Sequence, residues 1–82
     1  MITLENLRKE GNIIKTNYYS DDNVDDQGYL EFDISKDEIV KAEYSEEDLR
    51  YSRAYDAGYA RRAIRKLVAR NSYPKRYQYI WY

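Results

Sequence analysis

The spacing of the apolar residues changes at Ser45, and this change constrains the fold more than any other feature of the chain. Before it, Leu30, Phe32 and Ile34 alternate with polar residues, which is the period of a β-strand with one buried face. After it, apolar residues recur every three or four positions over residues 46–70, which is the period of an α-helix. The apolar side of this helix comprises Leu49, Ala57, Ala60, Ala63, Ile64, Leu67 and Val68. A strand-rich segment followed by one long helix indicates an α+β domain.

Three segments before Ser45 have the composition of strands: residues 12–19, 28–34 and 38–44. In the third segment, Val40, Ala42 and Tyr44 share one face. The connections between the segments are short and polar, which favours an antiparallel three-strand meander. The tail over residues 76–82 again has the composition of a strand, and Pro74 separates it from the helix.

Helix-capping signals complete the predicted order (α)βββαβ. Thr3 can cap a short helix over residues 3–10 that ends at Gly11, and Ser45 with Asp48 approximates the capping box of the long helix. The predicted fold is a small antiparallel sheet, the meander plus a C-terminal strand, covered on one face by one long helix. The predicted core is Leu30, Phe32, Ile34, Val40, Ala60, Ile64, Leu67 and Val68.

The length of 82 residues predicts a single domain over residues 1–82 whose stability is marginal. The sequence has no Cys and no His, so it offers neither a disulfide nor the usual zinc ligands. Such a domain has a reason to oligomerise. The charged N-terminus does not read as a signal peptide, and no apolar run approaches the length of a membrane span. We therefore expect a soluble, cytoplasmic protein with no membrane contact.

Charge is distributed unevenly along the chain. Residues 1–49 contain fourteen acids and five bases, a net charge of −9, whereas residues 50–82 contain nine bases and one acid, a net charge of +8. There are also eleven Tyr residues against one Phe and one Trp. Tyr combines a large apolar ring with a polar tip, so an excess of it is typical of half-buried or binding surfaces.

No set of residues forms a catalytic, cofactor or metal motif. The acidic loop around Asp21, Asn23 and Asp25 matches the first ligand positions of a calcium loop, but Asp26 stands where that loop needs Gly and Phe32 where it needs Glu. Without His or Cys the commonest bases and nucleophiles are missing. We therefore expect a protein that is not an enzyme and has no catalytic residues, no cofactor and no metal ligands.

The candidate binding surface is a stripe along the long helix, opposite its apolar side. It consists of Tyr51, Tyr55, Tyr59, Arg62, Lys66 and Arg70. Their spacing of three and four residues places aromatic and basic side chains on one outward face, called here the helix ridge. Such a surface suits a protein partner or a second copy of the chain. Two structural alternatives stay open: the tyrosines can pack under the C-terminal tail, or the cations can pair with the acidic strands of the same molecule.

Two function classes follow from the helix ridge. The first is a small protein-interaction or regulatory module, and the alternative is a small nucleic-acid-binding protein that uses the same cations for phosphates. A net charge of −1 lacks the basic excess typical of nucleic-acid binders, which favours the first class.

Overall fold

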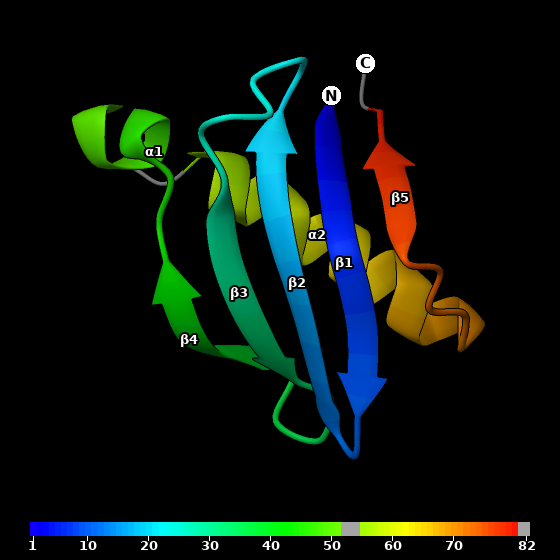
Figure 1. Cartoon of the computed structure of the whole chain (residues 1–82). Helices are drawn as coiled ribbons and strands as arrows, with labels where there is room; N and C mark the ends of the chain where they lie inside the picture. Colours follow the sequence, from blue (N-terminus) through cyan, green and yellow to red (C-terminus); the bar gives the residue numbers. More distant parts are fainter. Residues whose placement is uncertain (52–54, 81–82) are drawn as a thin grey trace.

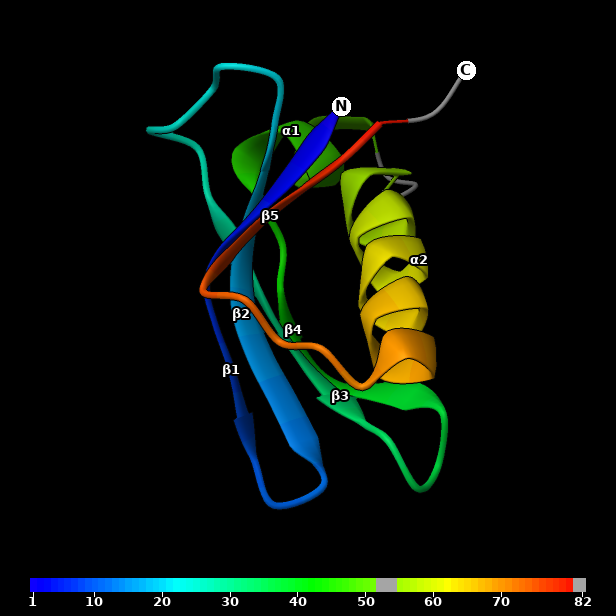
Figure 2. The same cartoon turned by 90° about the vertical axis from the view of Figure 1, so that its right-hand side faces the viewer.

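A computed structural model describes residues 1–51 and 55–80 of the chain (Figure 1). Its elements are β1 (Ile2–Glu10), β2 (Ile13–Ser20), β3 (Gly28–Asp33), β4 (Glu38–Glu43), α1 (Glu46–Tyr51), α2 (Tyr55–Arg70) and β5 (Arg76–Tyr79). The strands form one antiparallel sheet in the order β4-β3-β2-β1-β5. α2 packs across one face of the sheet, and among the described residues no element covers the other face (Figure 2). The predicted α+β fold, a meander plus a C-terminal strand under one long helix, is confirmed.

The predicted N-terminal helix is wrong, because residues 2–10 form β1. This strand pairs with β2 on one side and β5 on the other, so it lies inside the sheet. Its pairing with β2 shifts between Glu5 and Arg8, and Asn6 has a positive φ of 55°. Asn tolerates this left-handed conformation better than most residues, as a β-bulge at this point requires. The bulge gives Leu4 and Leu7 the spacing of a helix although both are buried in a strand.

Gly11 has the left-handed conformation that the helix prediction assigned to it, with a φ of 62°, but in a different element. Glu10 pairs with Ile13, so Gly11 opens a two-residue turn between β1 and β2. Gly at the first position of such a turn matches the right-handed twist of the two strands.

The core lies between α2 and the inner face of the sheet. It consists of Ile2, Leu4, Leu7, Ile14, Tyr18, Leu30, Phe32, Ala57, Ala60, Ala63, Ile64 and Leu67. Of the predicted core residues, Ile34 and Val68 pack against this cluster only partly buried. Val40 is wrong as a core residue, because its side chain is 45% exposed. A register shift in the pairing of β3 with β4 makes Ile39 the partner of Phe32 and leaves Val40 as an extra residue.

The predicted long helix is divided into α1 and α2, and residues 52–54 lie outside the described residues. Leu49, predicted on the apolar side of one continuous helix, is 62% exposed on α1. α2 ends as predicted near Asn71, which has a φ of 50°, while Ser72 donates its amide to the carbonyl of Leu67. This arrangement satisfies carbonyls that the helix end would otherwise leave open.

The predicted C-terminal strand is confirmed over Arg76–Tyr79, which pairs with β1. The end of that prediction, Trp81 and Tyr82, lies outside the described residues. Neither helix, over the part of the chain that the structure describes, has both the length and the apolar character needed to cross a bilayer.

Candidate functional site

The outer face of α2 carries the helix ridge, whose residues divide between two places. Arg62 and Lys66 lie beside a shallow groove of about 420 Å³, together with Arg65, Ala69 and Tyr79 of β5. Tyr55 instead lines a pocket at the beginning of α2. Arg70 is exposed at the end of α2, and the side chain of Tyr51 lies outside what the structure describes. The ridge is therefore a basic groove at one end and a tyrosine beside carboxylates at the other.

The cations of the basic groove lie against aromatic rings. The guanidinium of Arg62 lies 5.4 Å from the centre of the Tyr59 ring, and the ammonium of Lys66 lies 5.1 Å from the centre of the Tyr79 ring. Each distance is within the range of a cation–π interaction, which is worth about 0.5–1 kcal/mol at an exposed site. The second contact joins α2 to β5, a strand whose role in the groove the sequence does not reveal. These rings hold two flexible side chains in place at the edge of the groove.

Internal pairing uses one cation of α2 among the described residues. The guanidinium of Arg65 lies 3.2 Å from the carboxylate of Asp37 in the turn between β3 and β4, and both side chains are more than half exposed. The other ion pairs of the described residues join β-strand, turn and N-terminal groups to one another. Arg65 lies beside the helix ridge and is not one of its residues, so among the described residues no ion pair joins a ridge cation to the acidic strands. The ring of Tyr59 packs against the edge of the core.

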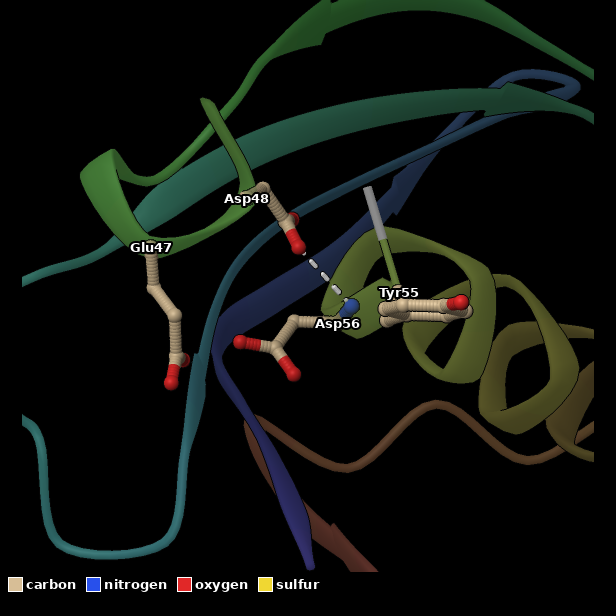
Figure 3. A pocket seen from close by; sticks show the side chains of 4 residues that line it. All are labelled: Glu47, Asp48, Tyr55 and Asp56. Atoms are coloured by element: carbon tan, nitrogen blue, oxygen red, sulfur yellow. Dashed lines mark hydrogen bonds between the residues drawn. The ribbon is translucent and has the colours of Figure 1, made fainter. Parts of the chain in front are cut away.

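The pocket at the beginning of α2 is a junction of carboxylates, called here the acidic junction. It has a volume of about 320 Å³ and is lined by Glu47 and Asp48 of α1 and by Tyr55 and Asp56 of α2 (Figure 3). The carboxyl group of Asp56 is turned toward Glu47, and the ring of Tyr55 lies along the outside of the helix (Figure 3). The short helix α1 brings two of the three acids of its first turn, Glu47 and Asp48, to the beginning of α2.

Asp48 holds this junction together. Its side chain is buried, and its carboxylate accepts hydrogen bonds from the amides of Asp56 (2.9 Å) and Ala57 (3.1 Å) at the start of α2. It also accepts a hydrogen bond of 2.6 Å from the phenol of Tyr18. The phenol oxygen in turn accepts a hydrogen bond of 3.1 Å from the backbone amide of Ser45. A carboxylate at a helix N-terminus satisfies open amides and favours the positive end of the helix dipole. Asp48 thus ties α1, α2 and β2 together.

Tyr18 and Asp56 have perturbed acidities for related reasons. Burial, and then the hydrogen bond to Asp48, raise the pKa of the Tyr18 phenol. Burial, and then a hydrogen bond with Glu47, raise the pKa of Asp56 from its ordinary value of 3.8 to about 7. The same hydrogen bond, with that from Ser20 at 2.7 Å, lowers the pKa of Glu47. At pH values between the two pKa values, Asp56 therefore carries a proton while Glu47 is ionised.

The acidic loop before β3 also has a structural role. The carboxylate of Asp26 accepts hydrogen bonds from the backbone amides of Glu46 (2.7 Å) and Glu47 (3.0 Å). Asp26 therefore caps α1 from outside the helix. Over residues 1–51 and 55–80, no three acidic side chains gather in a way that could hold a metal ion.

Sequence reasoning missed Tyr18, Asp48 and Asp56 as parts of one junction. A signal for Tyr18 existed: it lies two and four residues after Thr16 and Ile14, so it shares their face, and a buried phenol needs a hydrogen-bond partner. Asp48 stood in the predicted capping box of the long helix, but its carboxylate caps the second helix and not the first. Comparisons with protein-family models, with curated proteins and with solved structures found no match to this chain.

Proposed function

We propose that this domain is a non-enzymatic protein-interaction module that binds an acidic segment of a partner protein in the basic groove of α2 and β5. The observation that carries the proposal is the pair of cation–π contacts, Arg62 on Tyr59 and Lys66 on Tyr79, at the edge of one groove. Cations ordered in this way lose less conformational freedom on binding than free side chains.

Charge complementarity selects the partner. Arg62, Arg65 and Lys66 surround the groove, and Asp37 is the carboxylate that reaches one of them within the described residues. Carboxylates of a bound segment would add hydrogen bonds to guanidinium groups, which bind such anions in a bidentate manner. Ala69 and the ring of Tyr79 supply apolar contact between the charges. An acidic segment with apolar residues between its charges fits this pattern best.

The same cations could contact phosphates, but the aromatic rings favour a protein. Single-stranded nucleic acids bind largely by stacking bases on exposed aromatic faces. Here Arg62 covers a face of the Tyr59 ring and Lys66 a face of the Tyr79 ring, and Tyr59 also packs against the core. The net charge of −1 adds no general attraction for nucleic acid.

The test is a double charge reversal, Arg62→Glu with Lys66→Glu, measured on an array of short peptides with acidic residues at varied positions. We expect the wild-type chain to bind a subset of acidic-apolar peptides and the reversed variant to bind them at least about 10-fold more weakly, because each desolvated charge contact is worth about 1–3 kcal/mol. Fluorescence anisotropy on the best peptides gives the affinities.

A matched control reverses two exposed cations elsewhere, Lys9→Glu with Lys36→Glu, which changes the net charge by the same amount. This control should keep peptide affinity near that of the wild type. If peptide affinity falls equally in both variants, the effect is due to overall charge, and the proposal that the groove binds the peptide is refuted. A single-stranded oligonucleotide bound more tightly than any peptide, with a steep salt dependence, would replace the proposal by the nucleic-acid alternative.

A further inference from the structure

The edge strand β4 borders a second groove, distinct from the basic one. α2 packs chiefly on β1, β2 and β3, so the sheet extends past the helix at β4 (Figure 1). The groove left there has a volume of about 200 Å³. Its lining consists mainly of Leu30, Ile39, Ala42, Tyr44, Ala57 and Gly58. Next to it, Val40 and Tyr44 are 45% and 46% exposed, so the molecule shows apolar surface at this edge.

Gly58 keeps this groove open at a cost to the helix. It occupies the interior of α2, where Gly is less stable than Ala by about 0.8–1 kcal/mol. A Cβ atom at this position would meet nothing within 4 Å, so the packing of the chain itself does not require Gly here. A site at which another molecule approaches the helix closely would account for it.

The bulge of β4 aligns two opposite charges. Glu31 pairs with Lys41, Phe32 with Ile39 and Asp33 with Glu38, so Val40 is the extra residue. Glu38 and Lys41 are three residues apart, yet the bulge puts both on the outer face of the sheet, while Ile39 lies on the helix face with Phe32. In a regular strand, residues three apart would point to opposite faces.

This arrangement is self-complementary, and we propose that β4 pairs antiparallel with β4 of a second copy of the chain. With Ile39 opposite Ile39, and with Val40 of each copy left out as the extra residue as it is toward β3, each Glu38 faces the Lys41 of the other copy. The register that places Ile39 opposite Ala42 would instead set Glu38 against Glu43 and Lys41 against Lys41, and like charges directly opposite destabilise a sheet. The bulge itself is compatible with such pairing, because β3 already accommodates it.

The resulting dimer has one continuous sheet with both helices on the same side. Ile39 and Val40 of the two copies meet at the seam, where Val40 loses exposure to water. The contact is small, since one edge strand and a groove cover less than the ~800 Å² per partner of a standard interface. We therefore expect association in the micromolar to millimolar range. It does not depend on the basic groove of α2 and β5.

In many proteins a bulge or a Lys on an edge strand prevents that strand from pairing with another chain. The experiment must therefore distinguish a β4 that is protected against pairing from a β4 that pairs with its copy. Sedimentation velocity from micromolar to millimolar concentration measures association of the wild type and of the single reversals Glu38→Lys and Lys41→Glu. Each reversal sets like charges against each other twice in the homodimer, so each should weaken association at least about 10-fold. Mixing the two variants restores both opposite-charge pairs, and the mixture should associate again as a heterodimer.

A swap variant with Glu38→Lys and Lys41→Glu together should dimerise like the wild type. If Lys41→Glu fails to fold beside Glu31 and Glu43, the single reversal Glu38→Lys, which leaves Lys41 in place, still decides the test. Amide exchange adds a second measurement: protection in β4, but not in β5, should rise with protein concentration. A wild type that stays monomeric throughout, or single reversals that associate as well as the wild type, would overturn the proposal. Lys9→Glu, on an exposed residue of β1, serves as the control and should leave association unchanged.

Discussion

The contact between Gly28 and Tyr18 gives the sharpest test of the packing that supports the acidic junction. The two residues are cross-strand partners in β2 and β3, and a Cβ atom added at Gly28 would overlap Cε1 and Cζ of the Tyr18 ring. The ring has no room to move aside, because its hydroxyl is bound to the buried carboxylate of Asp48 and to the amide of Ser45. Gly28→Ala must therefore displace either the strand or the ring.

The size of the effect follows from these two contacts. Forcing one extra carbon into a filled core costs about 1–3 kcal/mol, and losing a hydrogen bond to a charged group costs about 1.5–3 kcal/mol. We expect Gly28→Ala to lower the free energy of unfolding by about 3–5 kcal/mol, since both losses occur together. A domain of this size has about 4–12 kcal/mol in total, so the variant should lose a large share of its stability.

Urea unfolding followed by circular dichroism measures this loss, with Gly58→Ala as the matched control. The control makes the same chemical change where a Cβ atom meets nothing, so it should raise stability by about 0.5–1 kcal/mol. The second variant Gly28→Ala with Tyr18→Leu removes the ring that causes the overlap and should lose less than the sum of the single changes. If Gly28→Ala is as stable as the wild type, the ring does not pack over Gly28 and the reasoning fails.

Three further predictions concern the core, the bulge and the acidic junction. Phe32→Ala should lower the free energy of unfolding by about 3–5 kcal/mol, because its side chain is 1% exposed, and a wild-type melting curve would contradict its place in the core. Asn6→Gly should be tolerated within about 0.5 kcal/mol, whereas Asn6→Val should cost about 1–3 kcal/mol at a positive φ, and equal urea midpoints would refute a left-handed residue there. Because the pKa of Asp56 is raised to about 7 in the folded chain from an ordinary 3.8, its contribution to stability is present at low pH and is lost as the pH rises toward 7. Asp56→Asn should therefore flatten the decline in urea midpoint between about pH 4 and 7, and an unchanged decline would place the titration elsewhere.

The sequence predicted the elements whose apolar spacing is regular. β3 alternates without interruption, and the second half of α2 repeats every three to four residues, so Phe32 and Ile64 were both assigned correctly to the core. The prediction failed where an extra residue breaks the period of a strand. At Asn6, the bulge gave Leu4 and Leu7 a helical spacing, and at Val40, a second bulge reversed the face of the residues that follow it.

The candidate site was predictable only in part, for a related reason. Helical spacing placed Arg62 and Lys66 together correctly, because both belong to the regular part of α2. Tyr79 joins Lys66 through the pairing of β5 with β1, and a contact between such distant segments leaves no periodic signal in the sequence. The acidic junction depends on the division of the predicted long helix into α1 and α2, and no Pro or Gly marks that division in the sequence.

The uneven charge of the chain is explained only partly by helix electrostatics, and the remainder bears on the proposed function. Asp56 in the first turn of α2 and Arg70 in its last turn each lie at the end of the dipole that favours their charge. This effect falls off within one turn, so it does not account for the cations in the middle of the helix. Of these, Arg65 has an acidic partner in Asp37, whereas Arg62 and Lys66 lie over aromatic rings. Cations grouped at one groove repel one another and lower the stability of the isolated domain, and an acidic segment bound there would remove that repulsion.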